Sequence, residues 1–213
     1  MGKGMERAHR GIAVGLCVLG LLAIGIAGAQ AQAQRPMSLQ ADELPLEEQP
    51  GVVPDPDEER LPAVYQRQLV FFRTAEPPGT IIISTSERFL YLVLGNNRAL
   101  RYGIGVGRDG FQWSGLLRIS RKAEWPDWIP PPEMIDRQPY LPRFMAGGPG
   151  NPLGARALYL GNTVYRIHGT NQPQTVGHPV SSGCFRLVNG DVIDLYERVP
   201  VGTKVVVRQS PEL

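Results

Sequence analysis

The residues with the clearest chemical potential are His168 and Cys184, sixteen positions apart. His168 ends a strand-like run, and Cys184 follows a glycine shortly before a helix-like stretch. An interval of this length lets the chain return to the end of its own strand, so the two side chains can meet. Imidazole can then remove the thiol proton, and the thiolate is the attacking form of cysteine. The pair indicates nucleophilic catalysis; a structural histidine and an ordinary buried cysteine are the alternative.

The residues around Cys184 would assist such a nucleophile. The N-terminus of the following helix and the guanidinium of Arg186 both favour a thiolate. Gly183 permits an unusual backbone conformation, which would leave the N–H groups of residues 182–184 available as an oxyanion hole. Arg186 has a second interpretation, an ion pair with Asp191 or Asp194 of that helix.

Two other patterns do not lead to a site. Residues 105–110 have the glycine spacing of a dinucleotide fingerprint, but Phe-Gln-Trp-Ser and a strand follow where that motif requires a helix. His168, His178 and Cys184 do not follow the spacing of a closed zinc site, and a fourth ligand is not evident. We therefore expect no metal and no cofactor, and we interpret His178 as a surface residue.

The elements that must position the pair are short strands between Gly, Pro and Asn turns, which predicts a mainly β fold. A Gly161-Asn162 turn predicts a hairpin ahead of His168. One helix is expected over 190–198, with Asn189 as its N-cap. Residues 125–154, rich in Trp, Pro and Gly, are either a binding loop or lid or a surface loop that packs on the sheet. The strands are expected at 69–72, 80–83, 89–94, 98–106, 116–120, 157–160, 163–167 and 204–208.

The first 33 residues have the layout of a secretory signal peptide. Basic residues precede an uncharged run over 11–29, and Ala-x-Ala cleavage options follow. The run is also long enough to span a bilayer, so an uncleaved membrane anchor is the alternative. Both interpretations predict a periplasmic or cell-envelope location. In that oxidising compartment a lone cysteine is a liability unless its reactivity is used.

Residues 34–62 carry eight carboxylates, two arginines and no aromatic residue. This composition predicts a flexible, acidic, Pro-rich linker, with an acidic partner-binding tail as the alternative. A catalytic domain is then expected over 63–210. Residues 61–213 hold 17 Lys and Arg against 11 Asp and Glu, a net charge of +6. Such a charge suits an anionic partner such as the cell wall, and export argues against nucleic acid.

Two segments carry a resemblance to a known family. Tyr165-Arg-Ile-His-Gly-Thr-Asn171, followed by Ser181-Ser-Gly-Cys-Phe-Arg-Leu-Val-Asn189, closely resembles the signature of L,D-transpeptidases of the YkuD type. The resemblance covers roughly residues 78–208. It implies a β-sandwich-like catalytic domain with a short helix after the cysteine. It also implies roles for Cys184 (nucleophile), His168 (general base), Gly169 (orientation of the imidazole), and Ser181, Ser182 and Gly183 (orientation or oxyanion binding).

The resemblance further implies a two-step acyl transfer on peptidoglycan stem peptides. The cysteine would attack the diaminopimelate carbonyl of a tetrapeptide stem and expel the terminal D-Ala. An amine would resolve the thioester, giving a 3→3 crosslink or a wall-anchored lipoprotein, whereas water would make the enzyme a carboxypeptidase. Carbapenems would acylate Cys184, and Arg186 would meet a substrate carboxylate.

Some family members have a histidine where Ser182 stands, so His168 is expected to be the only base here.

Three other functions fit parts of the pattern. A sortase-like or papain-like peptidase is the nearest enzyme alternative, although papain-type enzymes place the cysteine before the histidine. A non-catalytic wall-binding module on the same fold is the third, and the intact His168–Cys184 pair argues against it.

Overall fold

The structure is a computed structural model that describes residues 50–55 and 60–209. The predicted signal or anchor segment lies outside the described residues, as does most of the predicted linker. No helix among the described residues is long and apolar enough to cross a bilayer. The described ends of the linker contact the domain: Gly51 donates its N–H to the Gly150 carbonyl at 2.9 Å, and Leu61 is buried against Val176 and Val188.

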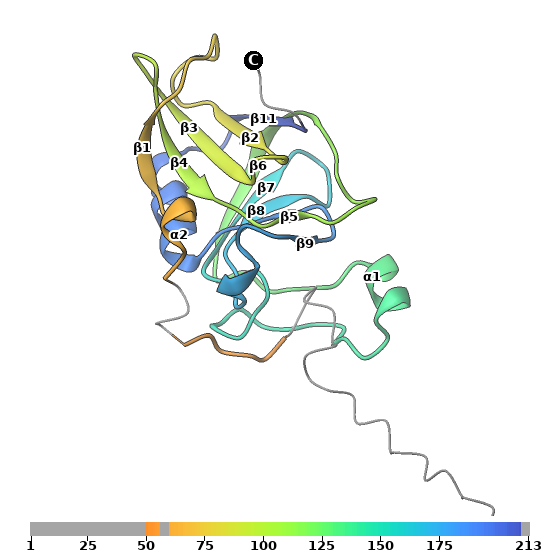
Figure 1. Cartoon of the computed structure of the whole chain (residues 1–213). Helices are drawn as coiled ribbons and strands as arrows, with labels where there is room; N and C mark the ends of the chain where they lie inside the picture. The colour runs from red at the N-terminus through yellow and green to blue at the C-terminus, as the bar shows by residue number, and fades with distance from the viewer. Residues whose placement is uncertain (1–49, 56–59, 210–213) are drawn as a thin grey trace, which may run out of the picture. The chain divides into compact units, whose positions relative to one another are not determined.

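Strands dominate the described residues, as the sequence predicts (Figure 1). Nine strands form one sheet in the order β1-β4-β3-β2-β11-β6-β7-β8-β10, and β5 pairs with β9. A short 3₁₀ turn, η2 (Ala63–Tyr65), precedes the first strand. The strands are β1 (Gln68–Phe71), β2 (Ile81–Ser84), β3 (Phe89–Gly95), β4 (Arg98–Gly103), β5 (Val106–Gly107), β6 (Gly115–Glu124), β7 (Arg156–Leu160), β8 (Arg166–His168), β9 (Pro179–Ser181), β10 (Phe185–Arg186) and β11 (Lys204–Arg208).

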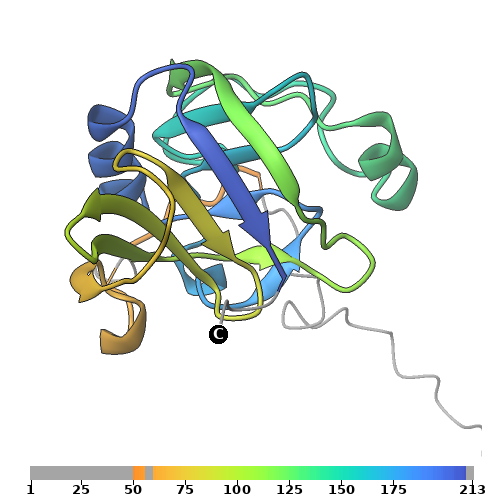
Figure 2. The same cartoon turned by 90° about the horizontal axis from the view of Figure 1, so that it is seen from above.

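Strand β6 carries the sheet from one half to the other. Its first residues pair with β11, and its residues from Ile119 to Glu124 pair with β7, with a register shift between Ile119 and Arg121. Figure 2 shows β6 (green) lying beside β11 (blue) across the middle of the molecule. The sheet thereby folds back on itself, which produces the sandwich-like arrangement that the family resemblance implies.

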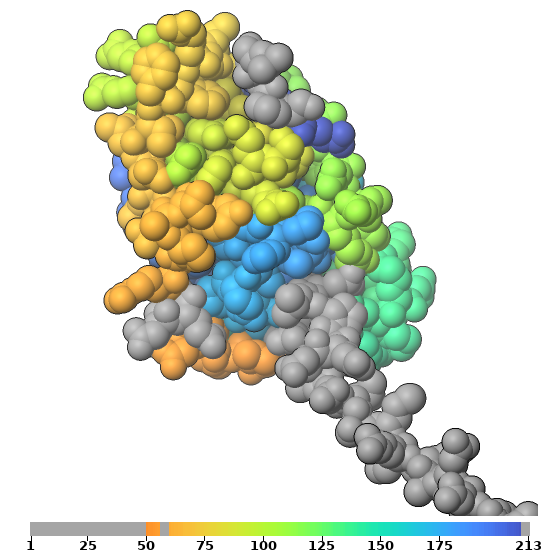
Figure 3. All heavy atoms as spheres, in the orientation of Figure 1, coloured from red at the N-terminus to blue at the C-terminus, as the bar shows by residue number. Residues whose placement is uncertain are grey.

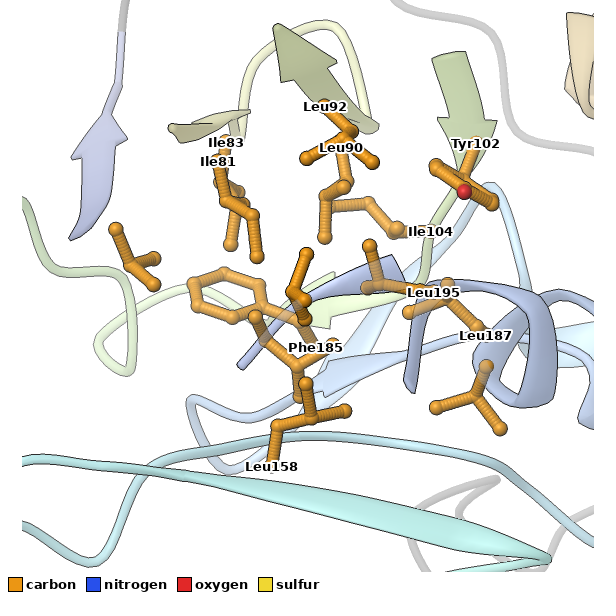
Figure 4. Close-up of a cluster of buried hydrophobic side chains, with 14 of the residues drawn as sticks. Ile81, Ile83, Leu90, Leu92, Tyr102, Ile104, Leu158, Phe185, Leu187 and Leu195 are labelled. Carbon is orange, nitrogen blue, oxygen red and sulfur yellow. The ribbon is translucent and has the colours of Figure 1, made fainter. Parts of the chain in front are cut away.

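The main core fills the space between the two halves (Figure 4). Ile81 and Ile83 of β2 point into it, because alternate residues of a strand face the same side. From the other half, Leu158 and Phe185 meet them. Each such side chain contributes about 1.5–3 kcal/mol by leaving water. Ile82 faces the other way and packs in a smaller cluster on the outer side.

Helix α2 (Asn189–Arg198) confirms the predicted helix but not its cap. Val188 occupies the N-cap position, with no side-chain cap hydrogen bond. The Asn189 side chain instead accepts a hydrogen bond from the Ala155 N–H at 2.8 Å and donates one to the Thr170 carbonyl at 3.1 Å. Asparagine was expected at this boundary for its local capping ability; here the same amide serves a long-range bridge.

Two predicted strands end earlier or begin later than expected. The strand predicted over 98–106 divides, because Gly105 leaves β4 to exchange two backbone hydrogen bonds with Arg186, at 2.9 and 3.0 Å. The predicted hairpin exists as β7 and β8, but its loop has five residues instead of two. Thr163 closes that loop by donating its hydroxyl to the Leu160 carbonyl at 2.7 Å.

Residues 125–154 form a segment with a small core of its own. Trp128, Met134, Leu141 and Leu153 are buried together, and Met134 belongs to the short helix α1 (Pro132–Arg137). The Asp127 carboxylate accepts the Gly147 N–H at 3.0 Å. The segment thus packs around residues of its own, and a binding role for it stays a prediction. Its helix α1 lies on the surface beside the loop that precedes β6, where Arg137 contacts the Phe111 ring (Figure 3).

Candidate active site

His168 ends β8 and is only 3 % exposed. Its Nδ1 lies 2.6 Å from the carbonyl oxygen of Gly169. Because a carbonyl can only accept a hydrogen bond, Nδ1 must carry the proton. In the neutral imidazole Nε2 is then the unprotonated nitrogen, which is the form that a general base requires.

The pairing of β8 with β10 brings the strand that ends at His168 beside the strand that begins directly after Cys184. The two strands are parallel, with Phe185 opposite Ile167 and Arg186 opposite His168. Ile167 and Phe185 both enter the main core. Since alternate residues point to opposite faces, His168 and Arg186 share the other face, and Cys184 directly precedes β10. Cys184 is a free cysteine of intermediate exposure, and its Sγ donates a weak hydrogen bond to the Val164 carbonyl at 3.8 Å.

Burial lowers the pKa of His168 to about 3, with the charge of Arg186 as the next cause and that of Arg166 also contributing. The hydrogen bond to Gly169 opposes this shift. The imidazole is therefore neutral near pH 7.

The Ser181 hydroxyl shapes the turn that carries Cys184. It donates to the Cys184 carbonyl at 2.6 Å and accepts the Gly183 N–H at 3.2 Å. The sequence prediction that all three N–H groups of residues 182–184 are available for an oxyanion thus needs correction, because that of Gly183 is engaged by Ser181. Ser182 points elsewhere and accepts a hydrogen bond from Arg137 at 3.1 Å.

An aromatic pair supports the same turn from the side. Trp113 donates its indole N–H to the Gly183 carbonyl at 2.9 Å and stacks on Tyr165 with ring centroids 4.5 Å apart. Gly183 has φ +105, and a Cβ added there would lie 2.7 Å from the Tyr165 ring. Glycine is therefore required for both its backbone conformation and the close approach of the ring. Sequence patterns gave no signal for Trp113.

Asn189 fixes the chain that follows His168. A Cβ on Gly169 would lie 2.5 Å from the Asn189 Oδ1, so the glycine lets the amide bridge pass close to the backbone. Gly169 also donates its N–H to the Arg156 carbonyl at 2.9 Å, which ties it to β7. The carbonyl that holds Nδ1 of His168 is thus held in turn by its neighbours.

Arg186 is buried, 1 % exposed, and lies opposite His168 on the neighbouring strand. The two aspartates proposed as its alternative partners both contact Arg67, Asp191 at 3.7 Å and Asp194 at 3.0 Å. Contact of Arg186 with a substrate carboxylate stays a prediction. His178 is exposed, as expected, and no group of three or more His, Cys, Asp or Glu suited to a metal ion occurs in residues 50–55 and 60–209.

A folded-back β sheet, with His168 at the end of β8 and Cys184 directly before β10, is the arrangement expected of an L,D-transpeptidase-type catalytic domain. The family model of the YkuD L,D-transpeptidase catalytic domain matches residues 78–207. This match covers more than half of the chain. The protein therefore belongs to the YkuD family.

Two curated relatives from Escherichia coli K12 resemble this chain over 62 % of its length. The probable L,D-transpeptidase ErfK/SrfK is 38 % identical over 138 residues, and the probable L,D-transpeptidase YbiS is 38 % identical over 142 residues. These regions make up 44 % and 45 % of the two relatives. The similarity thus spans less than half of each relative.

Solved structures give a further comparison. One from Brucella melitensis, described as a probable carnitine operon oxidoreductase, is 50 % identical to this chain, with a TM-score of 0.47; the match covers 72 % of this chain and 99 % of that one. An L,D-transpeptidase from Mycobacterium smegmatis is 16 % identical, with a TM-score of 0.48, and the match covers 61 % of this chain and 58 % of that one.

Proposed function

We propose that this protein is an exported peptidoglycan L,D-transpeptidase that uses Cys184 as its nucleophile and His168 as its general base. The acyl donor is a tetrapeptide stem, and the bond broken joins the L-centre of diaminopimelate to the terminal D-Ala. Membership of the YkuD family supports the class of reaction. The residues of the site supply the assignment of roles.

In the first half-reaction, His168 Nε2 takes the thiol proton while Sγ of Cys184 forms a bond to the diaminopimelate carbonyl carbon. The resulting oxyanion is stabilised by the backbone N–H groups of Ser182 and Cys184, since that of Gly183 already serves Ser181. The carbonyl then re-forms, the C–N bond breaks, and His168 returns the proton to the leaving D-Ala amine. The product is a thioester on Cys184.

In the second half-reaction, an acceptor amine attacks the thioester and gives its proton to His168. The C–S bond breaks, and the proton returns to the Cys184 thiolate. The cycle starts from the neutral imidazole, because the same nitrogen must accept a proton twice. We propose an amine of a second stem peptide as acceptor; an amine of a lipoprotein, or water, would use the same thioester.

The observation that most directly supports this proposal over the alternative functions is the 2.6 Å contact between His168 Nδ1 and the Gly169 carbonyl. It selects the tautomer in which Nε2 is a base, at the end of a strand whose neighbour β10 begins directly after Cys184. A wall-binding module without catalysis would not require a fixed tautomer. A sortase-like peptidase would share the thiol chemistry but would cleave ordinary L-peptides.

Mass spectrometry of the purified domain with diaminopimelate tetrapeptide muropeptides tests the function. We expect release of D-Ala, a thioester on Cys184 after rapid quenching, and a 3→3 linked product. A carbapenem should add its mass at Cys184 alone. Cys184→Ala should lose all three signals, whereas a mutation of the exposed His178 to Gln should keep them.

The outcomes separate the alternatives. Release of D-Ala without a linked product would identify a carboxypeptidase. Cleavage of ordinary L-peptides with no D-Ala release would overturn the proposal in favour of a peptidase. Binding of sacculi with no turnover by wild type, equal to that of Cys184→Ala, would identify a wall-binding module.

A further inference from the structure

Two arginines from distant segments converge on one aromatic ring. Arg108 follows β5, and Arg137 is the last residue of helix α1. The Cζ atom of Arg108 lies 4.3 Å from the centroid of the Phe111 ring, and that of Arg137 lies 4.9 Å from it. A phenyl face attracts guanidinium groups and holds their planes in place. Phe111 therefore acts as a common platform for two cations.

This arginine cluster, Arg108, Phe111 and Arg137, is attached to the turn that carries Cys184. The backbone N–H of Arg108 donates to the Ser181 carbonyl at 3.0 Å. Arg137 Nη2 donates to the Ser182 hydroxyl at 3.1 Å. The two residues contacted stand three and two positions before the nucleophile, so the cluster lies at the edge of the reaction site.

The cluster brings like charges together. The pKa of Arg108 is lowered, first by burial and then by the charges of Arg137 and Arg186. Arg137 is exposed, and its side chain contacts Ser182 and the Phe111 ring. Within the described part of the chain, no carboxylate forms an ion pair with Arg137. Convergent cations of this kind are stabilised when an anion arrives.

We propose that Arg137 and Arg108, held over Phe111, bind a carboxylate of the acyl-donor stem peptide next to Cys184. The segment 125–154 then serves as a specificity element that delivers Arg137 to the site. This inference rests on the proposed function for the identity of the donor. It assigns a substrate-binding role to a segment whose sequence fits either a binding loop or a packed surface loop.

Two carboxylates of the donor have the required chemistry. One is the C-terminal carboxylate of D-Ala, which lies one residue beyond the bond to be broken. The other is the free carboxylate at the D-centre of the diaminopimelate side chain. Donors amidated at one position or the other distinguish them, because amidation removes the charge with little change in shape.

The test measures binding of the donor tetrapeptide by calorimetry in a Cys184→Ala background, where turnover is removed. We expect Arg137→Gln to weaken binding about tenfold, the change that corresponds to roughly 1.4 kcal/mol. Arg137→Lys should retain part of the affinity. Arg143→Gln is the matched control, since Arg143 is exposed on the same segment outside the cluster; its affinity should not change.

Amidation completes the experiment as a cycle. With Arg137 in place, one of the two amidated donors should bind about tenfold more weakly than the unmodified donor. In the Arg137→Gln variant, the same amidation should change the affinity little. Equal binding by Arg137→Gln and Arg143→Gln would overturn the inference, and so would equal affinity for both amidated donors and the unmodified one. If Arg137→Gln fails to fold, the affinities of the amidated and unmodified donors for the Cys184→Ala protein, which keeps Arg137, test the inference.

Failure of the proposed function gives a different result. In that case wild type neither releases D-Ala from the unmodified donor nor binds it in the Cys184→Ala form. If instead wild type turns over the unmodified donor but shows no selective effect of Arg137→Gln or amidation, the function stands and the carboxylate site does not.

Discussion

Trp113 donates its indole N–H to the carbonyl of Gly183, seventy positions along the chain, at 2.9 Å. This bond reaches the peptide unit that directly precedes Cys184. The indole also stacks on Tyr165, whose ring leaves no room for a side chain on Gly183. The backbone ahead of the proposed nucleophile is therefore fixed from the side by one hydrogen bond and one ring.

Replacing Trp113 with Phe should separate these two supports. Phenylalanine keeps an aromatic face for Tyr165 but leaves the Gly183 carbonyl without its donor. A lost hydrogen bond of this type is worth about 0.5–1.5 kcal/mol, so we expect kcat/KM for D-Ala release to fall roughly three- to tenfold. Steady-state kinetics and a thermal melt measure the effect. A large loss of melting temperature with unchanged kcat/KM would show that Trp113 serves stability only.

Gly183→Ala should abolish most activity. The added Cβ meets both a backbone of φ +105 and the Tyr165 ring at 2.7 Å, so the turn must shift. Displacement of reacting groups by about 1 Å can cost about 100-fold, and we expect a loss in kcat/KM of at least that order. Gly110→Ala is the control, because Gly110 has φ +81 with nothing within 4 Å of an added Cβ. It should share the strain and keep the activity; equal kinetic losses in both variants would contradict the explanation.

The buried His168 should make stability depend on acid. Its pKa is about 3 in the folded protein and about 6.5 when unfolded. As the pH falls below 6.5, His168 binds a proton in the unfolded chain but stays neutral in the folded chain. The free energy of unfolding that this group contributes above pH 6.5 is therefore lost progressively toward pH 3. Between pH 7.5 and 5.0 this group should account for a fall of about 2 kcal/mol in the free energy of unfolding.

Urea denaturation at the two pH values checks the prediction. Wild type and His178→Gln should show the same pH-dependent fall, because His178 is exposed. In His168→Gln the fall should be smaller by about 2 kcal/mol, whatever the absolute stability of that variant. An unchanged pH dependence in His168→Gln would mean that the imidazole is charged or solvated in the folded state.

Most strands were predictable because their signals are local. A β-branched run such as residues 204–208 specifies a strand. A His-Gly motif followed by Ser-x-Gly-Cys predicts the pairing of His168 with Cys184, and that pairing stays a prediction. The unusual backbone conformation of Gly183 was also open to prediction, whereas the close approach of the Tyr165 ring was not. These features depend on a few neighbouring residues, which is the information that a sequence pattern contains.

The remaining features depend on contacts between distant segments. Asn189 has the residue type of a helix cap, yet its amide bridges Ala155 and Thr170. Nothing near Arg137 in the sequence indicates that it reaches Ser182, forty-five positions away. The Gly183 N–H was expected to be available, but the Ser181 hydroxyl takes it. Local sequence patterns identify hydrogen-bond donors and acceptors, whereas the tertiary fold determines which of them pair.

The place of β11 in the sheet has a consequence for how the domain assembles. This strand is the last of the strands in chain order, yet it lies between β2 and β6, pairing Val205 with Ile81 on one side and with Leu117 on the other. While residues 204–208 are still being synthesised, both neighbours present open backbone edges that other strands can join. Strand β11 gives the two halves a shared strand, and Gly105 and Arg186 connect them at another point through two backbone hydrogen bonds. Strands β2 and β6 are therefore expected to gain their shared neighbour only when residues 204–208 are in place, and a truncation before Lys204 should leave the facing edges of β2 and β6 without a partner strand.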